Sequence, residues 1–364
     1  MPRSIASALA LALTLLAGCD DGRVSVDGSV ALDADTSLDG GTAIDGGGAP
    51  IDGGGAVDAG RRDGGTLPPG IHVDPSCTDG LYTEAIPDVD ADISDIAFTE
   101  IGPYVDAVLD RRYPVGADLV AGGRMHTGFG MDCDILFAGG ASSGADVIGR
   151  LGTIVHECGH FFDLHLSSGS TSVYEVTGDL RLSCQRGDAT NRGGDTFARS
   201  RINDDAYSAL RPPCGGSGSD CDRYADIYLD GDPDDGTFQG GDQGFNMLFE
   251  ETVQYVNSLA VAWAFVDQRP AGQRTSARDG LLTFLWYTER YLRRARLQDP
   301  DAYARITDPC WRDAILEVWG RAWLYLEATE GITALGIADA TLMDLVTDPE
   351  LLEEIQRLRD LEGC

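Results

Sequence analysis

The sequence predicts a mainly helical domain with a small β-sheet, an α+β fold in which one long helix is followed by a C-terminal helical bundle. Three observations support this class. The chain has 364 residues, of which 43% are hydrophobic, so it can bury a sizeable core. Apolar residues recur at helical spacing after residue 245, and short apolar runs before residue 140 suggest strands. We therefore expect one folded domain over residues 71–364.

The charge of the chain excludes one class of partner. Asp and Glu number 60 against 27 Lys and Arg, which gives a formal net charge of −33. Contact with phosphate backbones depends on Lys and Arg, so we expect no nucleic-acid partner.

The N-terminus has the pattern of an export signal. Arg3 precedes an apolar run over residues 5–17, which suits a signal-peptide core and is too short to span a membrane. The run leads into Leu-Ala-Gly-Cys, ending at Cys19, which resembles the lipobox of bacterial lipoproteins. This resemblance implies a lipoprotein signal peptide over residues 1–18 and lipidation of Cys19. The protein would then be exported and lipid-anchored to a bacterial membrane, on its periplasmic side or at the cell surface.

The segment after Cys19 has a composition unlike the rest of the chain. Residues 19–70 are rich in Asp and Gly and contain no aromatic residue. Such a segment buries too little apolar surface to offset the entropy of ordering it. We expect a disordered tether, with a reach on the order of 40 Å.

The first half of the folded domain has a mixed pattern. Apolar spacing predicts a helix over residues 95–112 and one long helix over residues 144–165. Short apolar runs at 115–121 and 134–138 suggest strands. Residues 167–243, rich in Gly, Ser, Asp and Arg, suggest little regular structure.

The second half of the domain is strongly helical in its pattern. An amphipathic helix is expected over residues 245–266, and further helices are expected over 275–297, 309–329 and 348–361. Asp308-Pro309 and Asp348-Pro349 each have the form of a helix N-cap followed by proline at the first helical position.

The cysteine content predicts disulfides. Nine cysteines occur, and eight remain if Cys19 carries lipid. An even number in an exported chain indicates pairing, although the sequence leaves the connectivity open. We favour Cys214 with Cys221, which are close in sequence, and Cys310 with Cys364, which would hold the C-terminal tail.

One turn of the helix predicted over residues 144–165 carries the most informative chemistry. His156 and His160 are four residues apart, so both imidazoles lie on one helix face and can bind one cation. Glu157 follows His156 and is near enough to take a proton from a water molecule activated by that cation.

The flanks of this motif sharpen its interpretation. The sequence reads Thr-Ile-Val-His-Glu-Cys-Gly-His-Phe-Phe, with uncharged residues on both sides of the His-Glu-x-x-His core. It resembles the signature of the zincin metallopeptidases. This resemblance implies a zincin-like fold, a Zn²⁺ ion on His156 and His160, Glu157 as general base, and a peptide or protein as substrate.

The sequence leaves several candidates for the third metal ligand. Gluzincins take a glutamate from a later helix, and by resemblance Glu251 is the leading candidate here, with Glu250 next. Glu175 is an alternative that is closer in sequence. His165 is another, although it would lie on the opposite face from His156 if the helix continued.

Two further features are candidates for supporting roles. Tyr255 and His126 are candidates for stabilising the oxyanion that forms during amide hydrolysis. A loop with Asp230, Asp232 and Asp234 resembles the start of an EF-hand, but it lacks the glycine of position 6. It is a candidate Ca²⁺ site, with a solvated turn as the alternative.

Two function classes therefore compete. The first is a zinc metallopeptidase of the cell envelope. The second is a non-catalytic surface lipoprotein with a structural zinc site and a helical half that binds a partner. A structural zinc site has four protein ligands, whereas a catalytic site keeps one position open. The number of ligands therefore separates the two classes.

Overall fold

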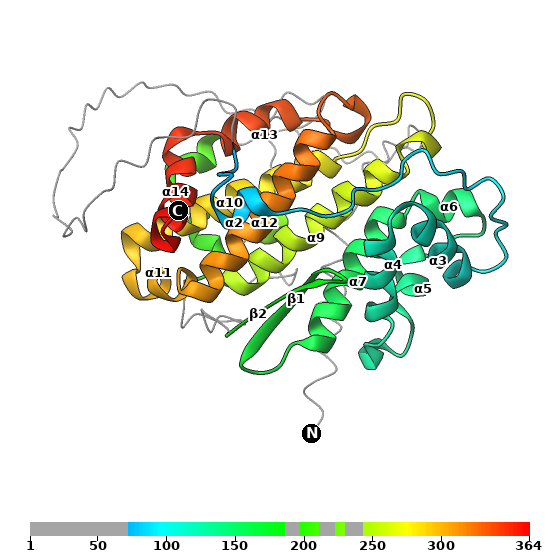
Figure 1. The fold of residues 1–364 in the computed structure, drawn as a ribbon, viewed down its shortest axis with the longest axis horizontal. Coiled ribbons are helices and arrows are strands. Elements are labelled where there is room, and N and C mark those ends of the chain that lie inside the picture. The colour runs from blue at the N-terminus through cyan, green and yellow to red at the C-terminus, as the bar shows by residue number, and fades with distance from the viewer. Residues whose placement is uncertain (1–71, 186–196, 211–222, 230–242) are drawn as a thin grey trace, which may run out of the picture.

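The computed structural model describes residues 72–185, 197–210, 223–229 and 243–364. It is mainly helical with one two-stranded antiparallel sheet, so the predicted class is confirmed at this level. In Figure 1 the helices between residues 101 and 166 lie on one side and most C-terminal helices on the other, with α9 running between them.

Several predictions fall outside the described residues. They are the signal peptide over 1–18, Cys19, the tether over 19–70, the Cys214–Cys221 pair and the Asp230, Asp232 and Asp234 loop. Within the described part of the chain, none of the helices combines the length and apolar character that crossing a membrane requires.

The first half of the described chain contains five short helices and one long one, α7. They are α2 (Thr78–Leu81), α3 (Ile101–Arg112), α4 (Pro114–Gly123), α5 (Cys133–Ala138), α6 (Gly144–Ile148) and α7 (Leu151–Leu166). The shortest, α2, packs against α12 (Pro309–Ala328) of the second half. The helix expected over 95–112 thus starts later, at Ile101. The expected helix over 144–165 is divided, because Arg150 leaves the helical region with φ −117° and ψ 0° directly after Gly149.

The two strands expected before residue 140 are wrong. Residues 115–121 and 134–138 lie in α4 and α5, because a short apolar run is as compatible with a buried helix as with a strand. Pro114 at the first turn favours the helix with its fixed φ. Gly123 lets α4 approach α7 closely, since a Cβ atom there would lie 2.4 Å from the Cys158 carbonyl oxygen.

The expectation of little regular structure over 167–243 is also wrong in part. β1 (Thr171–Thr177) and β2 (Leu180–Gln185) form a hairpin whose two-residue turn is Gly178-Asp179. β-Branched residues are frequent in β1, as strands favour. The hairpin is joined to helices on both sides: Glu175 N–H donates to Asp163 of α7 (2.7 Å), and Trp311 Nε1 donates to the Gln185 carbonyl (2.8 Å).

The second half is helical, as predicted. Its helices are α8 (Arg223–Tyr228), α9 (Phe245–Ala264), α10 (Ala277–Gln298), α11 (Pro300–Ile306), α12 (Pro309–Ala328), α13 (Asp339–Val346) and α14 (Pro349–Glu362). The two predicted N-caps are confirmed, since Asp308 accepts from Trp311 N–H (3.0 Å) and Asp348 from Glu350 N–H (2.9 Å).

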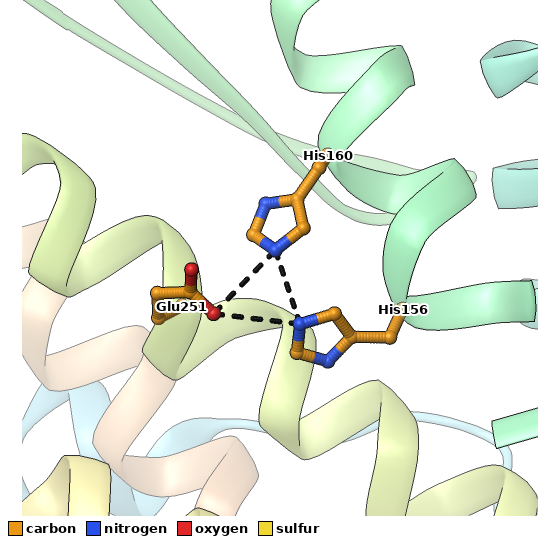
Figure 2. Close-up of side chains that lie close together, drawn as sticks. All are labelled: His156, His160 and Glu251. Carbon is orange, nitrogen blue, oxygen red and sulfur yellow. Dashed lines mark hydrogen bonds and ion pairs between the residues drawn. The ribbon is translucent and has the colours of Figure 1, made fainter. Parts of the chain in front are cut away.

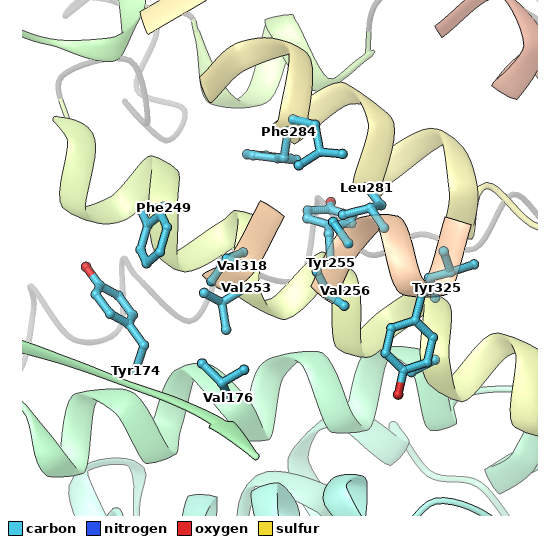
Figure 3. Packing of buried hydrophobic residues seen from close by; sticks show 14 of the residues in the cluster. Tyr174, Val176, Phe249, Val253, Tyr255, Val256, Leu281, Phe284, Val318 and Tyr325 are labelled. Carbon is cyan, nitrogen blue, oxygen red and sulfur yellow. The ribbon is translucent and has the colours of Figure 1, made fainter. Parts of the chain in front are cut away.

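Helix α9 lies at the centre of the core. Figure 3 shows its apolar side chains between β1 on one side and α10 on the other. Phe249 packs edge-on against Tyr174 of β1 with ring centroids 5.0 Å apart, and Tyr255 stacks on Phe284 of α10 at 4.6 Å. Aromatic contacts of this kind hold α9 in a fixed position.

Three disulfides join distant parts of the described chain: Cys77–Cys364, Cys133–Cys158 and Cys184–Cys310. The predicted Cys310–Cys364 pair is therefore wrong. Cys310 lies in the first turn of α12 beside β2, with its Sγ 3.4 Å from the Ser183 carbonyl oxygen, so it meets Cys184. Disulfides typically contribute about 2–4 kcal/mol each.

Candidate metal centre

The candidate centre lies where α7 contacts α9. His156, Glu157 and His160 of α7 are all buried, at 0%, 0% and 1% exposure. Gly159 makes this close contact feasible, since a Cβ atom there would lie 2.0 Å from Oε1 of Gln254 on α9. On the opposite side of α7, the Cys133–Cys158 disulfide ties the same turn to α5. The turn that carries the motif is thus held from both sides.

Glu251 of α9 meets the two histidines across this contact (Figure 2). Its Oε2 atom lies 3.4 Å from Nε2 of His156 and 3.5 Å from Nε2 of His160, and the two Nε2 atoms lie 3.0 Å apart. Within the described part of the chain, these three side chains form the group of His, Cys, Asp or Glu residues that could hold a metal ion.

The triangle fits a tetrahedral zinc ion. Bonds of about 2.0–2.1 Å at tetrahedral angles keep neighbouring ligand atoms about 3.3–3.4 Å apart. The three observed separations, 3.0, 3.4 and 3.5 Å, lie close to this value. Two imidazoles with one carboxylate are also a donor set that zinc accepts in catalytic sites. The side chains therefore match the ion in both chemistry and spacing.

The outer nitrogens of both histidines have hydrogen-bond partners. Nδ1 of His156 lies 2.9 Å from Oγ of Ser258, and Nδ1 of His160 lies 2.9 Å from Oε1 of Glu250. An Nδ1–H that donates outward leaves the Nε2 lone pair facing the triangle, as metal-binding histidines require. Glu250, the alternative ligand, therefore lies outside the triangle and contacts the outer nitrogen of His160 instead.

A buried hydrogen-bond chain fixes α7 to α9 beside the triangle. Gln254 Nε2 donates to Oδ2 of Asp163 (2.9 Å), and Asn257 Nδ2 donates to Oε1 of Gln254 (2.9 Å). Tyr113 then donates to Oδ1 of Asn257 (3.1 Å). Because buried polar groups are costly when unpaired, this chain favours one relative placement of the two helices.

The electrostatics of the centre favour positive charge. Burial alone would raise the pKa of Glu251, but the charge of His160 and the closeness of both imidazoles outweigh it, and the pKa lies well below its usual range. Burial lowers the pKa of His156. For His160 burial acts in the same direction, but Glu251 and Glu250 outweigh it and raise the pKa well above its usual value. The centre thus favours the ionised form of the Glu251 carboxylate beside a place that a cation can take.

The other ligand alternatives lie elsewhere. His165 is exposed near the end of α7 and takes no part in the group, because nine residues after His156 the helix presents the opposite face. Glu175 of β1 is buried but forms an ion pair with Arg181, so its charge is already balanced.

The two oxyanion candidates make contacts with other aromatic rings. The Tyr255 ring lies against the His156 ring, with centroids 4.8 Å apart, and its hydroxyl lies 3.4 Å from that of Tyr228. His126 is half-buried with its ring 5.5 Å from that of Phe161.

Sequence reasoning missed the supporting residues Ser258, Gln254 and Asn257. One signal for them was present: polar residues recur every three or four positions along a helix that is otherwise apolar. On a wholly buried helix, such a polar stripe marks a hydrogen-bonded or ligand-binding face.

Comparison with known proteins adds no relative. No family model, no curated protein and no solved structure matches the chain.

Proposed function

We propose that the protein is a zinc-dependent metallopeptidase of the HExxH type. The observation that carries this proposal is the triangle of His156, His160 and Glu251, whose ligand atoms are spaced as a tetrahedral zinc ion requires. A zincin-like architecture and a gluzincin-like ligand set belong to the same proposal.

Each residue of the centre has a separate role in the proposed hydrolysis. A zinc ion in this centre supplies Lewis-acid chemistry, lowering the pKa of water and polarising a carbonyl oxygen. Glu157, next to His156 on α7, accepts the proton of the attacking water on its carboxylate. It then donates that proton to the amine that leaves when the C–N bond breaks. Ser258 and Glu250 keep the imidazoles oriented throughout.

The competing proposal, a structural zinc site in a partner-binding lipoprotein, needs a fourth protein ligand. Among the described residues the group contains three side chains, with His165 outside it. This favours a centre with an open position, and hence the enzyme.

The substrate class and the location complete the proposal. The zincin-like motif favours a peptide or protein as the substrate. The lipobox resemblance at Cys19 favours an exported protein anchored by lipid at the bacterial cell envelope. The tether would then let the folded domain act at some distance from the membrane.

The test combines metal analysis with one substitution. Purified wild-type protein should hold one zinc ion per chain and hydrolyse members of a quenched-fluorescent peptide library. Glu157→Gln should hold the same zinc but lose activity by about 10²–10⁴-fold, the usual contribution of a general base. Glu353→Gln, an exposed glutamate on α14, is the control and should behave as wild type. Undiminished turnover in Glu157→Gln would remove Glu157 from the mechanism, and absence of zinc would remove the centre.

A further inference from the structure

One buried arginine lacks the partner that its counterparts have. Six arginines of the described residues are buried. Five of them form ion pairs with carboxylates: Arg112 with Asp267, Arg278 with Asp339, Arg290 with Asp205, Arg321 with Glu84 and Arg359 with Asp79. The sixth, Arg199, is 1% exposed, and its Nη1 atom makes no hydrogen bond with the described residues.

An unpaired buried guanidinium requires an explanation. Removing a charge from water is costly unless an opposite charge or a full set of hydrogen bonds replaces the solvent. For Arg199 the protein replaces only part of the lost solvent. Its Nε donates to the Tyr228 carbonyl (2.6 Å), and the guanidinium lies 5.1 Å from the centre of the Tyr228 ring. Nη1 is left as a strong donor, always protonated, with no acceptor among the described residues.

The position of Arg199 connects it to the candidate centre. Its backbone N–H donates to the carbonyl of Gln243 (2.8 Å), directly before α9 begins. Tyr228, which binds its Nε, lies with its hydroxyl 3.4 Å from that of Tyr255, and the Tyr255 ring lies against His156. Burial lowers the pKa of Arg199, and the first of the charges that oppose this effect is that of Glu251.

We propose that Arg199 binds an anionic oxygen of the substrate through Nη1, beside the candidate metal centre. This inference rests on the proposed function. Two substrate groups present such an oxygen: a carboxylate, and the reacting carbonyl as it gains negative charge. Both are acceptors for a guanidinium donor, and the experiment distinguishes between them.

The first arm measures binding and needs no turnover. The full chain, with and without zinc, is titrated calorimetrically with acetylglycine and with its neutral amide. If the group is a carboxylate, wild type should prefer acetylglycine by roughly tenfold or more, the size of a charged hydrogen bond. Arg199→Gln should abolish this preference, and Arg199→Lys should retain part of it. The preference should persist without zinc, so it can be observed even if the metallopeptidase proposal fails.

The second arm measures kinetics with a library peptide that wild type cleaves. If the group is the reacting carbonyl, Arg199→Gln should lower kcat by roughly tenfold or more with little change in KM, and acetylglycine should show no preference over its amide. This result also supports Arg199 as the anion-binding residue. Unchanged kcat and KM in Arg199→Gln, together with no loss of carboxylate preference, would overturn the proposal.

A paired arginine provides the matched control. Arg290 is buried to a similar extent but is bound to Asp205 (2.9 Å). Arg290→Gln should lower the melting temperature more than Arg199→Gln, because it leaves a buried carboxylate unpaired. It should change neither the acetylglycine preference nor kcat. A larger stability loss in Arg199→Gln than in Arg290→Gln, with ligand binding unaltered, would instead assign Arg199 a structural role and contradict the proposal.

Discussion

Two buried glutamates on neighbouring central helices have opposite charge states. Glu251 of α9 is 3% exposed and faces two imidazoles, and its pKa is well below the usual range because His160 and His156 outweigh its burial. Glu289 of α10 is 0% exposed, and neither of its carboxylate oxygens has a hydrogen-bond partner in the described structure. Burial, together with the charges of Asp348 and Glu354, raises the pKa of Glu289 well above the usual range.

The difference shows that burial does not determine the charge of a carboxyl group. At the α7–α9 contact, the histidine pair keeps Glu251 ionised and ready to bind a cation. Glu289 has acidic groups near it, Asp348 and Glu354, and no cationic group among the described residues offsets its burial, so the protonated form is favoured. The first region could hold a metal ion, whereas the second offers a carboxyl group no balancing charge.

The largest effect on stability should follow from removing one of the three candidate metal ligands. Zinc at about 1,000 times its Kd stabilises a folded protein by about 4 kcal/mol, because only the folded state has the site. We expect wild type to gain this stability in calorimetry with added zinc and His160→Ala to gain none. His165→Ala, an exposed histidine on the same helix, should gain as much as wild type. An equal gain in His160→Ala would show that zinc binds elsewhere.

The next effect concerns Glu289 and depends on pH. The unfolded chain loses the Glu289 proton near the ordinary carboxyl pKa, while the folded chain retains it. Wild-type stability should therefore fall as the pH rises above that point. Glu289→Gln lacks this dependence, so its advantage should grow by about 1.4 kcal/mol per pH unit until Glu289 ionises in the folded state.

Denaturation at pH 4 and at pH 8 measures this change. The variant should match wild type at pH 4 and exceed it at pH 8, whereas Glu353→Gln, on the surface, should not. An equal difference at both pH values would mean that Glu289 is ionised in the folded protein.

A third effect concerns the close contact between α7 and α9. A side chain at Gly159 would overlap Gln254, so Gly159→Val should force the helices apart. We expect a loss of about 1–3 kcal/mol of stability, as in other overpacked cores, together with weaker zinc binding. Gly169→Val, where a Cβ atom meets no neighbour within 4 Å, should be close to neutral. Unaltered zinc affinity in Gly159→Val would show that the spacing of the helices does not control the centre.

The smallest effect should come from Ser258, whose Oγ lies 2.9 Å from Nδ1 of His156. Loss of such a supporting hydrogen bond typically weakens metal binding by about 10–100-fold. Because the Ser258 hydroxyl is neutral, we expect Ser258→Ala to weaken zinc binding by about tenfold, at the lower end of that range. Competition with a zinc chelator measures the change. Glu250→Gln, which alters the charged partner of His160, should weaken binding more.

The sequence was informative where periodicity and short-range spacing determine the structure. The helices α9, α10, α12 and α14 follow from apolar spacing and N-cap residues, and one helical turn places His156 next to His160. Short buried helices such as α4 and α5 were mistaken for strands, because a run of five to seven apolar residues does not distinguish the two.

Contacts between distant segments could not be read from the sequence. Two features depend on how helices and hairpin pack: the pairing of Cys310 with Cys184, and the lack of an ion-pair partner for Arg199 among the described residues. Nothing about an arginine in a Gly- and Asp-rich stretch indicates that it will be buried. A family resemblance favoured Glu251 among the ligand candidates. Only the fold shows that the neighbouring Glu250 contacts Nδ1 of His160 instead.

The most direct test of the account is X-ray absorption spectroscopy of the zinc-loaded protein, which counts the ligands of the metal and identifies their elements. We predict two imidazole nitrogens, one carboxylate oxygen and one further oxygen from solvent, each at about 2.0–2.2 Å. His160→Ala should lose this spectrum. Four protein ligands, or any sulfur at about 2.3 Å, would contradict an open catalytic centre.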